Sequence, residues 1–405
     1  MKILLFIIDI LQYAFMAYLG IAALYFFMYS FAGVFKQKKP VQTDDKKRRF
    51  AVLIPGYKED QVIVEVAKHA LNQDYPSELY DVVIIADQFQ QETLDALDRL
   101  PILVNVVVFE KSSKSKALNN TLAWLPKDKY DAVMILDADN MMAPDVLTKM
   151  NQSMNCGFQA VQGHRLAKNT DTHFSRLDGI SEEINNHIFR KGHRILGLSS
   201  ALIGSGMAFD YNLFKDYMAT IDSYGEDKEL EFKLMKDDYK IEYVEDALIY
   251  DEKVSQSKVF VRQRTRWLFN QFLYGKLYGI EGFKLLFTKG NVDFFDKMFQ
   301  QLLPPRILLL GMITIITILS LLFNPLSLSY IWIAIASISF LAFSFAVPRR
   351  FYSWDTMKAA LFLPFGFILM FRSLSRLSEA KKGFGATQHT VTSIKTDKEK
   401  KDKNP

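Results

Sequence analysis

The feature that most constrains this chain is an almost unbroken apolar run from Ile3 to Phe35, in which Asp9 is the only acid. About 20 apolar residues are enough for a helix to cross a bilayer, and this run is longer. A cleaved secretory signal has a shorter apolar core and ends at a small-residue cleavage site. We therefore expect residues 1–35 to be an uncleaved transmembrane anchor.

A basic stretch follows this run and predicts its orientation. Its lysines and arginines are Lys36, Lys38, Lys39, Lys46, Lys47, Arg48 and Arg49. The positive-inside rule places such residues in the cytoplasm. Residues 36–49 are thus predicted to be a basic cytoplasmic linker, and the central domain is predicted to lie on the cytoplasmic side of the cell inner (plasma) membrane.

Two more apolar segments, Ile307–Phe323 and Ser329–Val347, lie near the other end of the chain. The arginines that follow them, at positions 349 and 350, mark a return to the cytoplasmic side. A third segment, residues 359–371, is short and contains Pro364. It is either a tilted span or an interfacial helix, so a multi-pass protein is expected.

An amphipathic segment precedes these spans. From Lys289 to Arg306, phenylalanine, methionine and leucine side chains recur at helical spacing. This pattern favours a helix lying on the cytoplasmic membrane face. We expect an amphipathic interface helix over residues 281–303, transmembrane or interfacial helices over 304–377, and a cytoplasmic or disordered basic tail over 378–405.

The charge balance and cysteine content narrow the range of partners. A net charge of +5 is modest for 405 residues, and the basic residues gather beside the apolar segments and in the last ten residues. This distribution indicates a membrane surface and does not suggest nucleic-acid binding. The single cysteine, Cys156, excludes an intramolecular disulfide and most cysteine-based metal sites.

The central part of the chain alternates apolar strands with helical stretches. The expected strands are Phe50–Ile54, Val82–Ala86, Ile102–Phe109 and the run that ends at Asp137. Such alternation is typical of parallel βαβ units and predicts an α/β fold with a Rossmann-like, nucleotide-binding half. No Gly-x-Gly-x-x-Gly follows the first strand, so a dinucleotide is not the expected ligand.

The last of these strands, within residues 131–140, ends on two carboxylates, Asp137 and Asp139. In an extended chain both would point to the same side. Two carboxylates at the carboxyl end of a buried strand suit Mg²⁺ or Mn²⁺ together with substrate phosphates. The alternative is an ordinary turn containing two acids. Glu59 and Asp87 also fall where strands end, and this recurrence favours a binding site.

Beyond this point the pattern is less regular. We expect a strand over Val161–Arg165, a helix over Asp171–Lys191 and a strand over Ser199–Phe209. The last is interrupted by Gly204-Ser205-Gly206. Glycines inside a strand often mark a close approach of the backbone to a ligand.

Glu226 and Asp227 open a charged helix that runs through Asp237. A carboxylate in the first turn is kept ionised by the helix dipole and can accept a proton. The alternative is an ordinary N-terminal capping acid.

The helix expected over Val259–Tyr274 carries Gln263, Arg266 and Trp267 on one face. An amide, a fixed cation and a large ring could hold a pyrophosphate and line an acceptor channel. The alternative is a membrane-proximal helix with a snorkelling arginine and an interfacial tryptophan.

Together these motifs resemble the membrane-integrated family 2 inverting glycosyltransferases, which include cellulose, chitin, hyaluronan and poly-N-acetylglucosamine synthases and ceramide glucosyltransferases. The matching features, in order, are Asp87, Asp137-x-Asp139, Glu226-Asp227 and Gln263-x-x-Arg266-Trp267. The resemblance covers roughly residues 50–377 and implies a GT-A domain over residues 50–280, with a UDP-sugar as the donor.

The resemblance also implies roles for individual residues. The nucleotide-sugar would be bound by Pro55, Tyr57, Glu59, Asp87, Lys114, Asp137, Gln263 and Arg266. Asp139 would be the main ligand of Mg²⁺ or Mn²⁺, with Asp137 beside it, and Asp227 would be the catalytic base, next to Glu226. Gly204, Ser205, Gly206 and Trp267 would line the acceptor site.

Some positions depart from the family pattern. The second strand ends Ala-Asp-Gln where many members have two adjacent aspartates, and Gly225 stands where the family has threonine. The closing segment 384–389 only loosely resembles the family's aromatic-x-x-Thr gating motif.

The expected reaction moves a hexosyl unit from a UDP-sugar to a hydroxyl of a growing β-linked polysaccharide. The alternative is a single addition to a membrane lipid, giving a glycolipid. Three or four spans leave little wall for a polysaccharide pore, so the first reaction would call for a homo-oligomer or an export partner.

Overall fold

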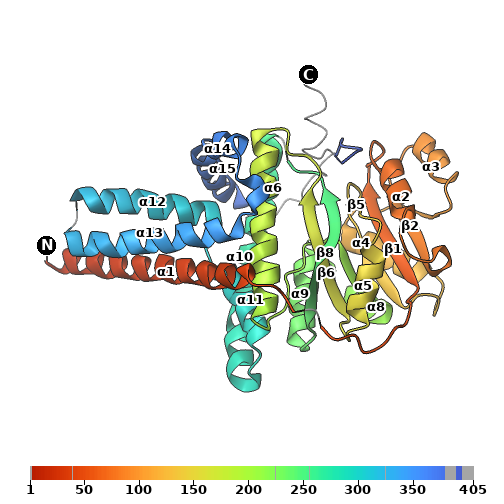
Figure 1. Ribbon diagram of the computed structural model, residues 1–405, viewed down its shortest axis with the longest axis horizontal. Helices are drawn as coiled ribbons and strands as arrows, with labels where there is room; N and C mark the ends of the chain where they lie inside the picture. The colour runs from red at the N-terminus through yellow and green to blue at the C-terminus, as the bar shows by residue number, and fades with distance from the viewer. Residues whose placement is uncertain are drawn as a thin grey trace.

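The computed structural model describes residues 2–38, 40–223, 225–254, 256–323, 325–378 and 389–394. A bundle of long helices extends from one end of a sheet-containing domain, with the N-terminus at its far tip (Figure 1). The bundle consists of α1 (Lys2–Val34), α12 (Arg306–Phe323) and α13 (Leu326–Ala346). These three helices, α1 from Ile10 onward, are long and apolar enough to cross a membrane. The pair α14 (Trp354–Ala360) and α15 (Leu363–Ser375), bent by 44°, could add a fourth crossing.

The sheet has eight strands in the order β3-β2-β1-β4-β7-β6-β8-β5. Strands β1 to β4 are parallel to one another, β7 runs antiparallel to β4 and β6, and β6 and β8 are parallel. The bounds are β1 (Phe50–Tyr57), β2 (Tyr80–Asp87), β3 (Leu103–Val107), β4 (Ala132–Ile135), β5 (Met141–Met142), β6 (Ala160–Ala167), β7 (Met207–Asp210) and β8 (Ile241–Asp251). The α/β prediction is confirmed.

Alternation along the strands explains why both faces of this sheet are covered. Leu53 and Ile135 point into one apolar cluster, whereas Val52 and Met134 point into the other. The helices of the domain are α2 (Ile63–Leu71), α3 (Gln91–Leu97), α4 (Lys114–Trp124), α5 (Val146–Met154), α6 (His173–Asn185), α7 (His193–Ile195), α8 (Tyr211–Met218) and α9 (Glu226–Lys236).

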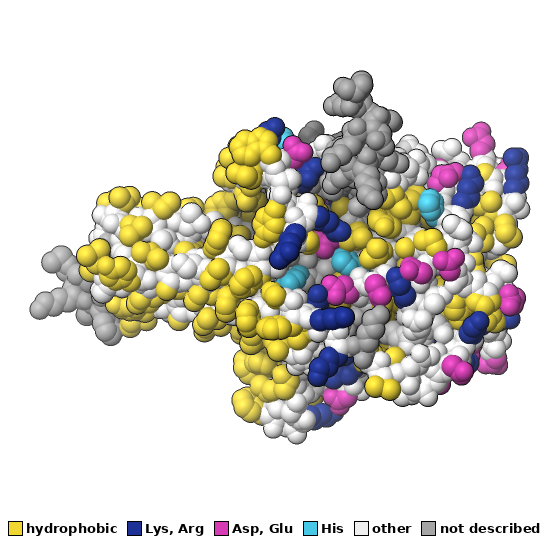
Figure 2. All heavy atoms as spheres, in the orientation of Figure 1, with side chains coloured by type: hydrophobic (Ala, Val, Ile, Leu, Met, Phe, Trp, Pro, Cys, Tyr) yellow, Lys and Arg dark blue, Asp and Glu magenta, His cyan; other side chains and the backbone are white. Residues whose placement is uncertain are grey.

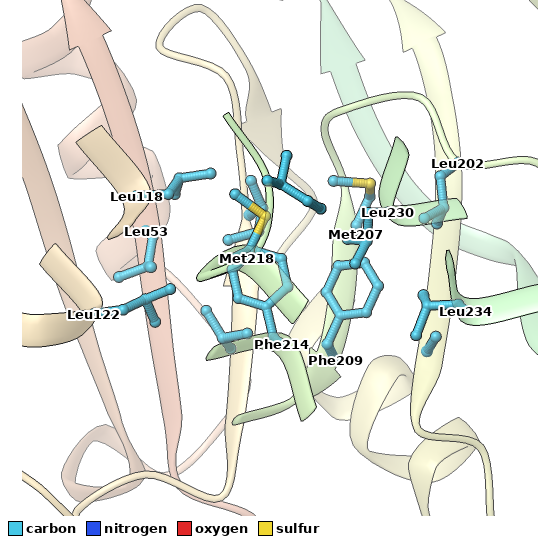
Figure 3. Packing of buried hydrophobic residues seen from close by; sticks show 14 of the residues in the cluster. Leu53, Leu118, Leu122, Leu202, Met207, Phe209, Phe214, Met218, Leu230 and Leu234 are labelled. Carbon is cyan, nitrogen blue, oxygen red and sulfur yellow. The ribbon is translucent and has the colours of Figure 1, made fainter. Parts of the chain in front are cut away.

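Figure 3 shows the first cluster, in which leucines of α4 and α9 face Leu53, Met207, Phe209 and Phe214. The side chains that fill this space come from both ends of the sheet. The parallel half and the antiparallel half therefore share one core.

The domain meets the bundle at the π-helical segment η2 (Asn186–Gly192) and at α7, which both contact α1. Helix α11 (Val292–Leu302) also reaches α1 through its Asp296, and the long helix α10 (Ser257–Lys289) packs beside α11. Hydrophobic side chains cover the bundle and continue onto these helices, whereas charged side chains gather over the sheet domain (Figure 2). The amphipathic helix predicted before α12 is present as α11. Residues 281–289, predicted to be part of it, instead end the 33-residue helix α10.

Three expectations about the second half of the domain need correction. Most of the strand expected over 199–209 is a loop, since Gly204 and Gly206 have φ of 81° and 67° and β7 covers only Met207–Asp210. The helix expected over 171–191 gives way at position 186 to a π-helical segment, η2 (Asn186–Gly192). Strand β8 was not predicted, because its exposed acids interrupt the alternating pattern.

The interior of the bundle is filled by side chains. Phe26 of α1, Leu309 of α12 and Trp332 and Phe343 of α13 are buried in one apolar cluster. Small polar groups also cross the interface, since the Ser30 hydroxyl donates a 2.5 Å hydrogen bond to the Ala342 carbonyl. Helices α1, α12 and α13 therefore pack against one another as a solid bundle.

Candidate active site

The chain turns immediately after β4. The strand ends at Ile135, and a hydrogen bond of 3.0 Å from the Asn140 amide to the Asp137 carbonyl closes a turn over residues 137–140. The extended geometry assumed for Asp137 and Asp139 is therefore wrong. Asp139 is buried and Asp137 is partly exposed, so the two carboxylates have different surroundings.

Lys114 connects three of the predicted elements. It is the first residue of α4, and its Nζ forms a hydrogen-bonded ion pair with Asp137 and donates 2.6 Å to the Gly204 carbonyl. It also lies 3.6 Å from Glu226 Oε1. Burial alone would lower the pKa of Lys114, but the carboxylates of Asp137 and Glu226 raise it above its ordinary value. Lys114 is therefore a fixed cation between the strand end and the loop.

Glu226 and Asp227 occupy the first turn of α9, as predicted. Burial, opposed by Lys114 and reinforced by Asp227, raises the pKa of Glu226 to about 7. A Cβ atom built on Gly204 would lie 3.6 Å from Asp227 Oδ2, so the glycine backbone borders this carboxylate. Asp227 therefore faces the loop predicted to hold the acceptor.

The Gly204–Gly206 loop is hydrogen-bonded to the end of β4 and to the turn over residues 137–140, which carries the two predicted metal ligands. Ser205 Oγ accepts a 2.9 Å hydrogen bond from the Asp137 amide, and the Gly206 amide donates 2.8 Å to the Ile135 carbonyl. Positive φ at both glycines makes this conformation costly for other residues. The local sequence thus fixes the Gly204–Gly206 loop against the end of β4.

Asp139 lies on the other side of the turn. Its Oδ2 accepts 3.0 Å from the Glu252 amide and its Oδ1 accepts 3.1 Å from the Asn140 side chain. Burial raises the pKa of Asp139, with Asp251 and Asp137 adding to the effect and His389 opposing it. Asp139 is thus a buried carboxylate in a surrounding that favours a nearby cation.

His389, from the end of the chain, supplies one positive charge to this site. Its Nδ1 lies 2.9 Å from Glu59 Oε1. Burial would lower the pKa of His389, but Asp139, Glu59 and Glu252 raise it to about 10. The amides of Thr390 and Val391 donate to Glu252 at 3.0 and 2.8 Å. Residues 389–391 therefore lie across the carboxyl ends of β1 and β8.

The ends of β1 and β2 lie side by side. Tyr57 pairs with Asp87 and Pro55 with Ile85 in the parallel register. Asp87 is 3% exposed, its Oδ1 has no hydrogen-bond partner in the described part of the chain, and burial raises its pKa.

The residues that follow these two strand ends are conformationally strained. Lys58 and Gln88 have φ of 57° and 58°, which is uncommon for residues other than glycine. Strain at adjacent strand ends is typical of functional sites. Together with the unpartnered Asp87 oxygen, it marks this edge as a binding surface.

Helix α10 also borders the site. Asn270 and Tyr274 contact Gly225, just before the Glu226-Asp227 pair, and the Tyr274 hydroxyl donates 3.0 Å to the Gly225 carbonyl. Gln263, Arg266 and Trp267 lie on the same helix. In the described structure no hydrogen bond or ion pair joins these three to the carboxylates.

Two contributors to the site were missed from sequence. Glu252 and His389 were not predicted, although His389 ends the segment compared with the gating motif. Residues 384–388 of that segment lie outside the described residues. Glu252 directly follows β8, so recognising that strand would have placed it at a strand end.

The carboxylates of the site can be compared with the ligands that a divalent cation requires. Among the residues that the structure describes, no group of three or more histidine, cysteine, aspartate or glutamate side chains is arranged to hold a metal. Mg²⁺ usually takes only one or two protein carboxylates and completes its coordination with water and substrate phosphates. The buried Asp139 and the adjacent Asp137 fit that smaller demand.

Comparisons with known proteins identify the family of the chain. The model of a protein family described as "Glycosyltransferase like family 2" matches residues 48–270 of this chain. An N-acetylglucosaminyltransferase of Rhizobium meliloti is 25% identical over 240 residues, which are 55% of this chain and 55% of the relative. A β-monoglucosyldiacylglycerol synthase of a Nostoc species is 27% identical over 235 residues, which are 54% of this chain and 47% of the relative. The chain thus spans about half the length of the curated relatives it matches.

A solved structure resembles more of the chain. It is a mannosyltransferase from Pyrobaculum calidifontis in complex with GDP-Man and Mn²⁺, with a TM-score of 0.52 and 14% identity, covering 88% of this chain and 94% of that one. At 14% identity, this structural similarity is evidence for the fold alone. Together with the match over residues 48–270, it confirms the predicted GT-A fold, and the chain belongs to the glycosyltransferase-like family 2.

Proposed function

We propose that this protein is an inverting membrane glycosyltransferase that moves a hexosyl unit from a UDP-sugar to a hydroxyl presented at the membrane surface. The observation that carries the proposal is the convergence on Lys114 of Asp137, Gly204 and Glu226, with Asp227 beside them. These groups come from four separate segments. Their meeting at the carboxyl ends of the strands is what a nucleotide-sugar site in an open α/β sheet requires.

The donor would lie across the ends of β1, β2 and β4. In this arrangement Pro55, Tyr57, Glu59 and Asp87 line the nucleotide, and Gln263 and Arg266 approach the diphosphate. Asp139, with Asp137, would hold Mg²⁺ or Mn²⁺. When bound, the cation would neutralise charge that develops on the departing diphosphate.

The chemistry is a single displacement. Asp227 takes the proton of the acceptor hydroxyl, and the hydroxyl oxygen forms a bond to the anomeric carbon on the face opposite the diphosphate. The bond between that carbon and UDP breaks with both electrons leaving on the diphosphate oxygen. An α-linked donor therefore gives a β-glycoside. Glu226, held by Lys114, positions Asp227 within the first turn of α9.

The acceptor that the geometry supports best is a membrane lipid. Trp267 and the Gly204–Gly206 loop would line its path, and α10 continues from Trp267 along the base of the bundle. The described spans pack their interior with side chains such as Phe26 and Trp332. Such a bundle suits single additions to a lipid that approaches from the side.

Synthesis of a β-linked polysaccharide is the second candidate. It is favoured by the combination of Gln263, Arg266 and Trp267 with the interface helix α11, a set characteristic of processive synthases. The named relatives are divided, because one is an N-acetylglucosaminyltransferase and another a glycolipid synthase. Export of a long chain would call for a homo-oligomer or a partner protein to complete the pore.

The membrane arrangement belongs to the same proposal. α1, α12 and α13 would cross the inner (plasma) membrane, and the GT-A domain, proposed over residues 50–280, would lie in the cytoplasm. Support comes from the lengths of the three apolar helices and from the basic residues 36–49.

Product sizing tests the proposal. Membranes containing the protein are incubated with radiolabelled UDP-glucose, UDP-N-acetylglucosamine and UDP-galactose in Mg²⁺ or Mn²⁺, and products are separated by size and by extraction into organic solvent. One labelled glycolipid is expected. A ladder of oligosaccharides would select the second candidate, and the absence of cation-dependent UDP release with all three donors would contradict the proposed reaction.

A further inference from the structure

A second group of buried charges lies where α6 meets β6, β8, α10 and the start of α12. We call it the arginine cluster. Its cations are Arg165, Arg190, Lys253, Arg264 and Arg306, and its carboxylates are Asp178, Glu182 and Asp251. The formal charge of this set is positive by two.

The three carboxylates are already shared among the other four cations. Glu182 lies 3.0 Å from Arg165, 3.3 Å from Arg190 and 3.6 Å from Lys253. Asp251 pairs with Lys253 at 2.5 Å and lies 3.6 Å from Arg165.

The remaining carboxylate, Asp178, pairs with Arg264 at 2.5 Å. This leaves Arg306, which donates from Nη2 only to the carbonyl and hydroxyl of Ser181, at 3.1 and 3.0 Å. Arg264 is close enough to repel its guanidinium. Within the described residues, Arg306 has no carboxylate within ion-pair distance.

Several guanidinium groups in the cluster also have nitrogens that lack partners. In the described part of the chain, Nη1 of Arg306 and Nε of Arg165, Arg190 and Arg264 are shielded from solvent and make no hydrogen bond. Arg190 is only 1% exposed. Burial lowers the pKa of both Arg190 and Arg264, and neighbouring Arg165 lowers each further. Buried donors that carry charge are costly unless an acceptor is supplied.

The position of Arg306 indicates where that acceptor comes from. Arg306 is the first residue of α12, one of the helices long and apolar enough to cross a membrane. In the proposed membrane arrangement, its side chain therefore lies where this helix enters the bilayer. Leu308 packs against Leu268 of α10 and Met370 of α15 on the apolar side. The ring of Trp267, which is 36% exposed, lies 4.1 Å from the Arg264 guanidinium. The site is therefore polar toward the domain and apolar toward the bilayer.

We propose that Arg306, backed by Arg264 and Arg190, binds the phosphate group of a membrane lipid. Arginine forks match phosphate oxygens in pairs, and a phosphate supplies both the missing negative charge and the missing acceptors. The depth of Arg306 favours a lipid over a soluble phosphate, since lipid phosphates lie at this level of the bilayer. The inference concerns binding alone and does not depend on the proposed reaction.

The test measures binding to the full-length protein in non-ionic detergent, from its thermal stabilisation at rising ligand concentration. The probes are dioctanoyl phosphatidic acid, dioctanoylglycerol with the same acyl chains, inorganic phosphate and UDP. Stabilisation by the phosphatidic acid is expected, with an apparent Kd about 10- to 100-fold weaker in Arg306→Gln, as loss of a charged hydrogen bond predicts. Arg349→Gln is the matched control, because this arginine is exposed and lies just after the last residue of α13, outside the arginine cluster. It should bind within about twofold of wild type.

Several results would overturn the inference. One is equal affinity of wild type and Arg306→Gln for the phosphatidic acid, and another is equal stabilisation by dioctanoylglycerol. If inorganic phosphate or UDP binds as tightly and depends on Arg306 in the same way, the site serves a soluble anion. Arg306→Lys covers the case in which Arg306→Gln does not fold. It keeps the charge but loses the planar fork, so its affinity should fall about three- to tenfold, and unchanged affinity would also reject the proposal.

Discussion

Two buried charge clusters in this molecule are built from similar parts in opposite proportions. At the strand ends, five carboxylates outnumber two cations, Lys114 and His389, whereas in the arginine cluster five cations outnumber three carboxylates. The five carboxylates are Glu59, Asp137, Asp139, Glu226 and Asp227. Neither cluster is neutral by itself. The proposed divalent cation would add positive charge to the first cluster, and the proposed lipid phosphate would add negative charge to the second.

A third buried group shows what a balanced cluster looks like. Asp296 of α11 accepts hydrogen bonds from Tyr25 and Tyr29 of α1 at 2.8 and 2.7 Å, lies 3.0 Å from His193 and accepts 2.8 Å from Gln300. Each oxygen of the carboxylate has two partners. This group connects α1 to α11 and leaves no oxygen of the Asp296 carboxylate free for a ligand. Imbalance, more than burial, therefore distinguishes the two candidate sites from this structural one.

The largest expected effect is at Asp227. Asp227→Asn should lower UDP release with acceptor present by about 10²- to 10⁴-fold, because the general base is lost, while UDP binding stays within about twofold. Turnover and UDP affinity are measured on the same preparation. Asp222→Asn, at an exposed position five residues earlier, should behave as wild type. Comparable turnover by Asp227→Asn would remove Asp227 from its proposed role.

The next effect concerns the buried carboxylate of the same cluster. Asp139→Asn should weaken binding of Mn²⁺ in the presence of UDP by roughly 10- to 100-fold, and chelation should abolish transfer until Mg²⁺ or Mn²⁺ is restored. Manganese binding is followed by electron paramagnetic resonance. Asp145→Asn, at a partly exposed position in the loop before α5, is the matched control. Unchanged affinity in Asp139→Asn would assign the cation to other ligands.

The balanced cluster should respond through stability and pH. Burial alone would raise the pKa of Asp296, but His193 and Tyr29 lower it to about 2, below the ordinary 3.8. This carboxylate therefore stabilises the fold by about 2 kcal/mol above pH 4, and the contribution is lost as the pH falls through about 2. Asp296→Asn should lower the Tm at pH 7, and its difference from wild type should shrink toward pH 2. A pH-independent difference would show that the charge is not what stabilises.

The smallest effect is expected from an ion pair between α6 and the segment after α13, in which one partner is exposed and the other buried. Arg350 contacts Glu183, but its side chain is 55% exposed, so solvent screens the attraction. Arg350→Gln should change the free energy of unfolding by less than about 1 kcal/mol, measured by denaturant titration in detergent. A larger loss would show that the exposure of Arg350 does not make this ion pair weak.

The parts of the fold that follow from local pattern could be predicted from sequence. The apolar run before Asp137 gave its strand, and the long apolar segments gave the three candidate spans. The loop at Gly204 was mistaken for a strand, because its composition is apolar while two glycines adopt positive φ. Strand β8 was missed because acids such as Glu242 and Glu245 occupy positions where apolar residues were expected.

The residues of the site could be predicted from sequence better than the contacts between them. Asp137 was predicted from the end of a strand, Glu226 from the start of a helix and Lys114 from the family resemblance, but 89 residues separate Asp137 from Glu226. Only the fold reveals that the Lys114 ammonium group contacts both of these carboxylates. His389 meets Glu59 across 330 residues, and the arginine cluster draws on at least five elements. Contacts of this range depend on tertiary packing, which no local pattern encodes.

The missing side chain at position 225 has a consequence for how this protein can vary. A Cβ there would lie 2.7 Å from Asn270 Nδ2 and 3.0 Å from the Tyr274 hydroxyl, so a larger residue fits only if one of those side chains shrinks or moves. In an alignment of orthologues, position 225 and these two positions should therefore covary. Orthologues with threonine at 225 should carry smaller residues at 270 or 274.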